Sequence, residues 1–252
     1  MIEAKSVTKT YGTTVVVDAV DLTLPAGGVT SIIGPNGAGK STLLSMISRL
    51  LPMDAGTVTV DGLDVTQTPG DVLARRLSIL RQDNSVLSRL TVRDLVAFGR
   101  FPHTKGRLTV EDRDHIDRAI AYLKLEPLAD RFVDELSGGQ RQRAFVAMVL
   151  CQDTDYILLD EPLNNLDMTH AVAMMKQLRR AADELGKTVV MVLHDINFAS
   201  VYSDHIVAMR DGKVLLQGPP ETLIAPEPLA QIYDLPVSVH MVEGQRIAVY
   251  YG

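Results

Sequence analysis

A glycine-rich stretch at residues 34–41 constrains the fold of this chain more than any other feature. It reads Gly-Pro-Asn-Gly-Ala-Gly-Lys-Ser and fits the pattern G-x-x-x-x-G-K-[ST], in which backbone N–H groups surround an oligophosphate at a distance that Cβ atoms would block. A β-branched apolar run at 29–33 precedes it, and apolar residues at helical spacing follow at 42–47. The order strand, glycine loop and helix therefore predicts a phosphate site at a helix N-terminus.

Two residues at the end of this stretch carry its chemistry. Lys40 is expected to reach the β- and γ-phosphates of a nucleotide, and the Ser41 hydroxyl is the predicted Mg²⁺ ligand. The alternative is a glycine-rich turn before a buried helix. The agreement of all eight positions and both flanks favours the phosphate site.

Composition limits the remaining possibilities. The chain has 252 residues, of which 46% are hydrophobic, so we expect one α/β domain over residues 1–252 with a packed core. A net charge of −6 argues against broad nucleic-acid binding. Cys151, the only cysteine, lies in an apolar run and is interpreted as a core thiol. No charged-then-apolar leader opens the sequence and no apolar run approaches the roughly 20 residues that span a bilayer, so we expect any work at a membrane to go through partners.

The first third of the chain contains strand patterns and two polar candidates. Residues 2–24 alternate in a way that predicts an antiparallel sheet. Within it, Tyr11 is either a platform for stacking an adenine or a buried sheet tyrosine. Gln82 ends a strand-like run and can place an amide oxygen on a metal or a water, although a surface amide would look the same. A short helix is expected at 73–76.

A helical insert is predicted at about 84–150, because apolar residues there recur at helical intervals. Within it, residues 103–107 are expected to form a solvated polar loop. The insert ends in the sequence Leu-Ser-Gly-Gly-Gln at 136–140. Ser137 and Gln140 have the spacing of a helix capping box, which is a structural explanation. Two glycines at a helix start also expose N–H groups, so a second anion site is the alternative that stays open beside the capping box.

Two further apolar runs end in polar side chains. Residues 156–160 form a buried-strand pattern that ends in Asp160 and Glu161, at the carboxyl edge where α/β sheets bind ligands. Asp160 is placed to hold Mg²⁺ through water, and Glu161 to polarise a water aimed at a γ-phosphate. A second strand at 188–193 ends in His194, which is either structural or a γ-phosphate contact.

The last part of the chain offers less. A helix is expected at 168–185 and a hairpin at about 206–216. Residues 219–252 are interpreted as a short tail, too small for an independent regulatory domain. No internal repeat or low-complexity linker is visible.

Taken in order, these motifs resemble those of the ATP-binding cassette family, and the resemblance covers nearly the whole chain. The sequence LSGGQ between the two nucleotide motifs is the most specific of them. The matching residues are Tyr11 (adenine-stacking aromatic); Gly34, Pro35, Asn36, Gly37, Ala38, Gly39, Lys40, Ser41 and Thr42 (phosphate loop); Gln82 (glutamine loop); Ser137, Gly138, Gly139 and Gln140 (within LSGGQ); Asp160 and Glu161 (second nucleotide motif); Asn165, Leu166 and Asp167 (the loop that crosses the dimer); and His194 (switch histidine).

The resemblance implies a phosphate-loop NTPase core with an antiparallel β-subdomain and an inserted helical subdomain. It also implies a head-to-tail homodimer that encloses ATP, in which the LSGGQ residues of one chain cap the γ-phosphate bound by Lys40 of the other. Glu161 would then act as general base and His194 as a γ-phosphate contact. Mg²⁺ is implied at Ser41, Gln82 and, through water, Asp160.

A finer resemblance is to the ATPase subunits of bacterial ferric-siderophore importers, including the catecholate branch that serves petrobactin, within a group that also imports haem and cobalamin. It rests on residues 159–168 and 194–199. It implies transmembrane permease partners, a substrate-binding lipoprotein or periplasmic protein, no nucleic acid, and a peripheral position on the cytoplasmic face of the membrane. Residues 83–90 are the first expected permease contact.

Other functions within this family remain open. Members that act on DNA ends insert long coiled coils, and ribosome-acting members carry two cassettes, neither of which is seen here. An ATPase for iron–sulfur cluster assembly has the same size and stays an alternative. A phosphate-loop kinase would have no use for residues 136–140.

Overall fold

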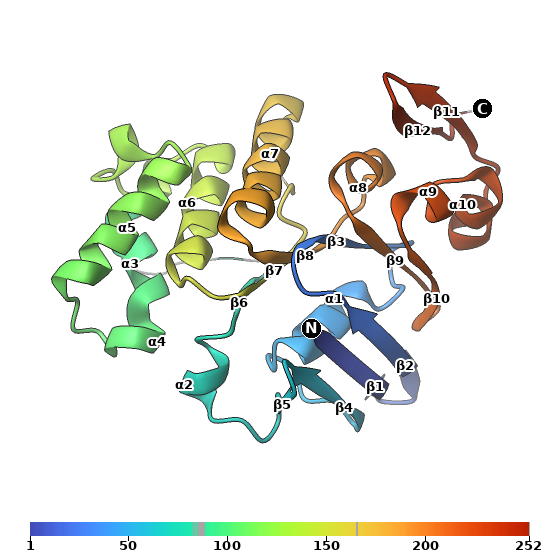
Figure 1. Ribbon diagram of the computed structural model, residues 1–252, viewed down its shortest axis with the longest axis horizontal. Coiled ribbons are helices and arrows are strands. Elements are labelled where there is room, and N and C mark those ends of the chain that lie inside the picture. Colours follow the sequence, from blue (N-terminus) through green and yellow to red (C-terminus); the bar gives the residue numbers. More distant parts are fainter. Residues whose placement is uncertain (83, 85–88, 165, 252) are drawn as a thin grey trace. The chain divides into compact units, whose positions relative to one another are not determined.

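The computed structural model describes residues 1–82, 84, 89–164 and 166–251, and Figure 1 labels its elements. The chain separates into two compact units. We call Met1–Thr68 with Thr188–Gly252 the two-sheet unit, and Pro69–Lys187 the helical unit. Within the described ranges, no helix combines the length and the apolar content needed to cross a bilayer. The expectation of one domain over residues 1–252 stays a prediction.

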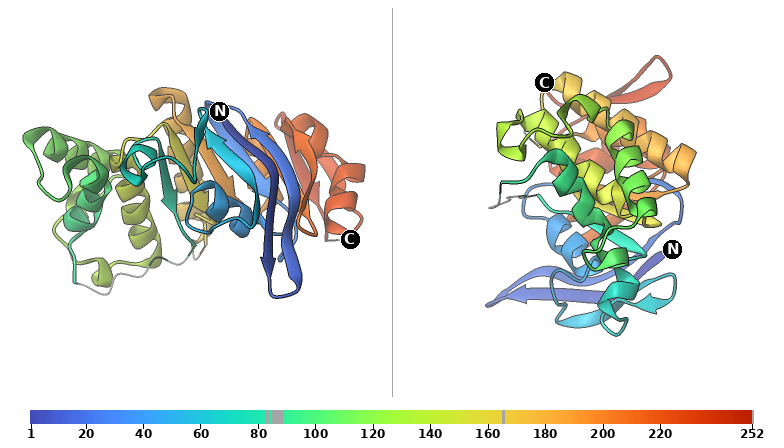
Figure 2. Two further views of the ribbon diagram at one scale, coloured as in Figure 1. Left: turned by 90° about the horizontal axis from the view of Figure 1, so that it is seen from below. Right: turned by 90° about the vertical axis from the view of Figure 1, so that its left-hand side faces the viewer.

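The alternating start of the chain builds the first sheet of the two-sheet unit. Its strand order is β2-β1-β4-β5, and each neighbouring pair is antiparallel. The bounds are β1 Ile2–Tyr11, β2 Thr14–Leu24, β4 Ala55–Val60 and β5 Leu63–Asp64. Figure 2 shows β1 and β2 as one long twisted ribbon. The antiparallel sheet predicted from residues 2–24 is therefore confirmed.

Parallel strands form the core of the second sheet in this unit. β3 (Gly28–Ile33) pairs in parallel with β8 (Thr188–Val192) on one side and β9 (His205–Arg210) on the other. β10 (Lys213–Gly218) returns from β9 as an antiparallel hairpin. All five residues of β8 are buried, which is why this strand reads as a continuous apolar run. Helix α1 (Lys40–Ile47) follows β3.

The C-terminal segment is folded rather than a simple tail. It contains α9 (Pro220–Leu223), α10 (Pro226–Tyr233) and a hairpin of β11 (Ser238–Val242) with β12 (Gln245–Val249). Asn197, in α8 (Ile196–Tyr202), attaches this hairpin: its Nδ2 donates to the Ala248 carbonyl at 3.3 Å, and its Oδ1 accepts the Ala248 N–H at 2.8 Å. The helix that follows His194 is therefore anchored to the last strand.

The helical unit contains two parallel strands, β6 and β7, together with helices. Its strands and α-helices are β6 Leu77–Leu80, β7 Tyr156–Asp160, α2 Gly70–Leu73, α3 Val92–Ala97, α4 Phe101–Thr104, α5 Val110–Tyr122, α6 Gly138–Cys151 and α7 Met168–Leu185. Short 3₁₀ turns lie at Phe98–Arg100, Glu126–Leu128 and Val133–Glu135. Cys151 is a buried thiol, as predicted, and burial raises its pKa to about 12.

Two local predictions in this unit are wrong. The helix expected at 73–76 lies at Gly70–Leu73, where Pro69 has the extended backbone of an N-cap and its carbonyl accepts the Leu73 N–H. His103 and Thr104, expected in a polar loop, belong to α4, which begins at Phe101. Pro102 is at the start of that helix, where a missing N–H costs nothing.

Candidate nucleotide site

The phosphate loop, residues 34–42, runs from β3 into α1 with a backbone that glycine adopts and other residues rarely do. Gly34, Gly37 and Gly39 have φ values of 143°, 79° and 93°. A Cβ on Gly34 would lie 2.0 Å from the carbonyl oxygen of Met209, and one on Gly39 would lie 2.5 Å from that of Val16. The backbones of β9 and β2 thus leave no room for side chains at two of these positions.

Lys40 lies beneath this loop. Only 5% of its surface is exposed, and its Nζ donates to the carbonyls of Gly34 and Pro35, both at 2.9 Å. Helix α1 begins at Lys40 with Gly39 as N-cap and no side-chain cap, and Ser41 and Thr42 follow in its first turn. First-turn N–H groups and a lysine ammonium are donors that phosphate oxygens bind. The loop therefore fits an oligophosphate.

Tyr11 is the last residue of β1, and 51% of its surface is exposed. The alternative of a buried sheet tyrosine is therefore wrong. The Lys9 ammonium lies 5.7 Å from the centroid of the tyrosine ring. An exposed aromatic ring is suited to stacking a flat base, and that role stays a prediction.

His194 lies at the same sheet edge as the phosphate loop. Ile32 and Val192 are register partners in the parallel strands β3 and β8, so the residues that follow these strands emerge together. The Leu193 N–H continues the ladder to the Ile32 carbonyl at 3.1 Å. Beyond it, Asp195 caps α8 by accepting the N–H groups of Asn197 and Phe198 at 2.7 Å and 3.1 Å. His194 is therefore exposed between two fixed elements.

Carboxylates and amides gather at the ends of β6 and β7 in the helical unit. Asp160 ends β7 and is 7% exposed. Glu161 follows with φ 51°, a left-handed backbone that non-glycine residues rarely adopt. Its Oε2 accepts a hydrogen bond from Nε2 of Gln82 at 2.8 Å and another from Nδ2 of Asn164. Two amides therefore orient the carboxylate that is predicted to be the general base.

The donor types suit Mg²⁺, which prefers oxygen ligands. The predicted set consists of the Ser41 hydroxyl, the Gln82 amide oxygen and the Asp160 carboxylate. The side-chain nitrogen of Gln82 donates a hydrogen bond to Glu161, so the amide oxygen is the side-chain atom of Gln82 that remains to bind a metal. Ser41 belongs to the two-sheet unit, and Gln82 and Asp160 to the helical unit.

The turn at 137–140, which we call the signature turn, begins α6. Ser137 is its N-cap: its Oγ accepts the Gln140 N–H at 3.3 Å, and its own N–H donates to Gln140 Oε1 at 3.1 Å. The predicted capping box is therefore confirmed. Ser137 and Gly138 are exposed and Gly139 is half-buried. In this box Ser137 Oγ accepts a hydrogen bond, so its hydroxyl hydrogen can be donated to an anion. The N–H groups of Gly138 and Gly139, in the first turn of α6, have no acceptor within the helix.

Asp167 is the N-cap of α7, and its Oδ1 accepts both the backbone N–H of His170 at 2.8 Å and the ring Nδ1 at 2.7 Å. These bonds, the backbone one first, lower the pKa of Asp167. Of the neighbouring predicted residues, Asn165 lies outside the described part of the chain, as do residues 83 and 85–88 of the predicted permease contact.

The structure brings some predicted residues together and leaves the others divided between the units. Gln82 joins Glu161, and His194 joins the phosphate loop at one edge. Assembly of all these residues into one pocket stays a prediction. Sequence reasoning missed Asn164, in the loop after β7, and His170, in the first turn of α7, because the sequence does not show which side chains they contact.

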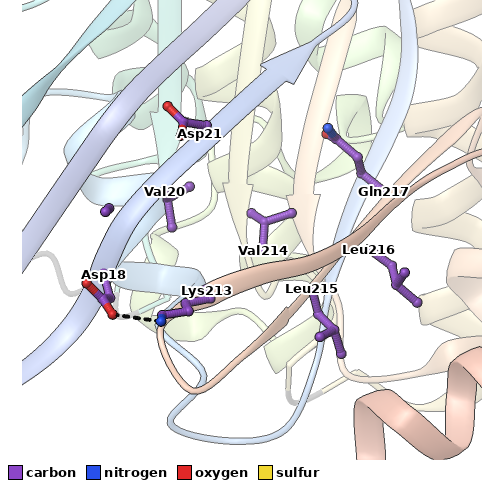
Figure 3. A pocket seen from close by; sticks show the side chains of 9 residues that line it. Asp18, Val20, Asp21, Lys213, Val214, Leu215, Leu216 and Gln217 are labelled. Atoms are coloured by element: carbon purple, nitrogen blue, oxygen red, sulfur yellow. Dashed lines mark ion pairs between the residues drawn. The ribbon is translucent and has the colours of Figure 1, made fainter.

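A separate groove of about 440 Å³ lies between β2 and β10 (Figure 3). Asp18 and Lys213 form an ion pair at its edge, at 3.1 Å. None of the predicted site residues lines this groove.

Comparisons with known proteins agree with this geometry. Residues 17–164 match the family model described as ABC transporter. The chain is 54% identical over 252 residues to the petrobactin import ATP-binding protein YclP of Bacillus subtilis (strain 168), with 100% of both chains covered. It is 52% identical over 250 residues to the petrobactin import ATP-binding protein FatE of Bacillus anthracis, covering 99% of this chain and 100% of that one.

Among solved structures, the ATP-binding cassette MJ0796, in a dimeric post-hydrolysis state bound to ADP and Pi, has a TM-score of 0.79 and 31% identity, covering 87% of this chain and 99% of that chain. The predicted fold, a nucleotide-binding core with an antiparallel sheet and a helical insert, is thereby confirmed. The chain combines a phosphate loop, strand-end carboxylates and a capped signature turn, and it is similar to a known ATP-binding protein along its whole length. We conclude that the chain belongs to the ABC transporter family as an ATP-binding subunit.

Proposed function

We propose that this chain hydrolyses ATP to drive import of a ferric siderophore of the petrobactin type. The observation that carries the proposal is similarity along the whole chain, at 54% and 52% identity, to two ATP-binding proteins of petrobactin import. The subunit would act at the cytoplasmic face of the membrane, bound to permease subunits that receive cargo from an extracytoplasmic binding protein. The permease and the binding protein would recognise the cargo.

In the proposed reaction, the chain's residues bind the triphosphate and activate water. Lys40 and the N-terminus of α1 hold the β- and γ-phosphates. Glu161 accepts a proton from water as the water oxygen bonds to the γ-phosphorus, and the bond from that phosphorus to the β–γ bridging oxygen breaks, leaving ADP and phosphate. When bound at Ser41, Gln82 and Asp160, Mg²⁺ supplies charge neutralisation to the phosphate oxygens.

Gln82 and Asn164 orient the proposed base. Both amides donate to one carboxylate oxygen, Glu161 Oε2. An ionised carboxylate only accepts hydrogen bonds, and it is the form that can accept a proton from water. The two hydrogen bonds fix the rotation of the carboxylate, and so the direction from which water is polarised.

A second chain would complete each pocket. The signature turn offers the Ser137 hydroxyl and the N–H groups of Gly138 and Gly139 at an exposed helix start. These donors suit a γ-phosphate whose other face is bound by Lys40 of the partner subunit. ATP would thus hold two copies head to tail, and hydrolysis would release them.

The helical unit also offers a surface for the permease. A pocket of about 360 Å³ lies beside α3 and α4, lined in part by Phe98, Phe101 and Leu108. Phe98 and Phe101 are 54% and 58% exposed. Exposed aromatic side chains around a pocket are the features of a protein-binding surface. We therefore expect replacement of both by serine to reduce co-purification with the permease.

The test of the function is reconstitution. ATPase activity of the chain should rise when permease and loaded binding protein are present in liposomes, and Glu161→Gln should abolish turnover while ATP still binds. Lys40→Ala, which loses a phosphate contact, is the control for loss of binding. An unchanged rate with the complete transporter, or parental turnover by Glu161→Gln, would contradict the proposal.

A further inference from the structure

We propose that His170 is a positioning residue that joins Asp167 to the signature turn, so that both present one rigid surface to a second copy of the chain. The proposal rests on the head-to-tail dimer proposed above. His170 was not among the residues predicted from sequence. Its contacts on two sides, within the helical unit, are what single it out.

The first contact is with Asp167. One carboxylate oxygen accepts two hydrogen bonds from the same residue: the backbone N–H of His170 at 2.8 Å and the ring Nδ1 at 2.7 Å. Because an ionised carboxylate only accepts, the ring nitrogen in this bond must carry the hydrogen. The imidazole is thereby held in one tautomer and one orientation.

The second contact is with Gly139. A Cβ built on this glycine would lie 3.0 Å from Cγ and 3.1 Å from Cδ2 of His170. The imidazole therefore packs against bare backbone at the second residue of α6. A Cβ at 139 would press on the ring, which would have to move by a few tenths of an ångström, so the glycine lets the imidazole lie close to the turn.

These contacts connect two segments that lie 30 residues apart in sequence. The Asp167 side chain is 65% exposed, and Ser137 and Gly138 are exposed as well. In the proposed dimer, all three face the partner subunit. His170 contacts both segments, and 41% of its side chain is exposed. Removal of the ring should therefore loosen the signature turn relative to Asp167.

The expected effect is on dimer formation and not on nucleotide affinity. Lys40 and the phosphate loop belong to the other unit, so binding of ATP to a single chain should not depend on His170. Loss of one hydrogen bond to a carboxylate and of the ring packing should weaken the ATP-dependent dimer by roughly tenfold or more.

Sedimentation of the Glu161→Gln protein with Mg²⁺ and ATP measures this. We expect His170→Ala to raise the dimer dissociation constant by about tenfold, while His170→Asn, which can still donate to Asp167, restores part of the loss. Lys176→Ala, an exposed truncation on the same helix, is the control and should dimerise like its parent. ATP affinity of the monomers should be equal in all four proteins.

A second measurement does not need the dimer. In the monomer, hydrogen exchange of amides at 138–142 should accelerate in His170→Ala and not in Lys176→Ala. Unchanged exchange together with parental dimerisation would overturn the role of His170. If the Glu161→Gln parent binds ATP but does not dimerise, the proposed dimer is overturned. The exchange rates would then decide alone: faster exchange in His170→Ala would support the role of His170, and unchanged exchange would overturn it.

Discussion

Replacement of Gly34 by alanine should damage the phosphate loop severely, and the structure gives the size of the effect. The new Cβ would lie 2.0 Å from the Met209 carbonyl oxygen, whereas ordinary van der Waals contact begins at 3.4 Å. Both clashing groups are backbone, so no side-chain rotation relieves the overlap of about 1.4 Å. Backbone strain at φ 143° adds to it. The clash and the backbone strain each cost about 1 to 3 kcal/mol, so we expect Gly34→Ala to cost about 4 kcal/mol of free energy in total.

This cost should appear mainly as lost ATP affinity, because the loop can escape the clash by moving away from β9. About 3 kcal/mol of the total, if carried by the loop, corresponds to a roughly 100-fold increase in the dissociation constant. Isothermal titration with a non-hydrolysable ATP analogue measures it, and chemical denaturation measures the remainder. Gly244→Ala is the matched control: Gly244 has φ 79°, nothing lies within 4 Å of its added Cβ, and it is in the β11–β12 hairpin.

We expect the control to lose about 1 to 2 kcal/mol of stability, from the left-handed backbone alone, and no affinity for ATP. Parental affinity and parental stability in Gly34→Ala would show that β9 does not confine the loop. Equal loss of ATP affinity in both variants would show that general destabilisation, and not loop geometry, is responsible.

Three further perturbations test separate parts of the structure. Tyr11→Ala should weaken ATP binding by about 1 to 3 kcal/mol in titration while Tyr11→Phe binds normally, because the ring is the proposed platform for the base; equal binding by all three proteins would refute stacking. Burial raises the pKa of Asp112, but bonds from Thr109 and the buried Arg100 outweigh it and hold the pKa at about 2. This stabilisation, at most about 2 kcal/mol, is complete above pH 4 and is lost as pH falls through 2. The difference in unfolding free energy between the parent and Asp112→Asn, measured in urea, should therefore be smaller at pH 3 than at pH 6, and an equal difference would contradict this. Asn197→Ala should speed amide exchange in the β11–β12 hairpin and leave β3 protected, since it removes the two bonds of Asn197 and leaves the bond from Ser200 Oγ to the Arg246 carbonyl; unchanged exchange in the hairpin would contradict this.

Elements with strong periodicity could be predicted from the sequence, whereas elements stabilised by tertiary contacts could not. Helix α7 occupies Met168–Leu185, as predicted, because its apolar stripe, its Asp167 cap and the glycine at its end agree. The C-terminal hairpin was missed because β11 is short and largely exposed. Its attachment depends on Asn197, a residue distant in sequence.

The same distinction holds for the site. The phosphate loop is predictable because its glycines and lysine are adjacent in sequence and each has a backbone or charge requirement. The pairing of Gln82 with Glu161 joins residues that follow two different strands, β6 and β7, so the sequence could only place each near a strand end. The contacts of Asn164 and His170 could not be predicted from the sequence, because they depend on side-chain direction in the folded chain.

In the proposed dimer, Lys40 of one chain and Ser137 of another share one ATP. Site-directed cross-linking tests it directly, because Asn36 beside Lys40 and Ser137 are both exposed and the natural Cys151 is buried with a raised pKa. Asn36→Cys and Ser137→Cys, each made in the Glu161→Gln background, are mixed and treated with a short bis-maleimide.

We expect an ATP-dependent cross-link only in the mixture, between one chain of each kind. Cross-links between identical variants, or none in a mixture that binds ATP, would contradict it.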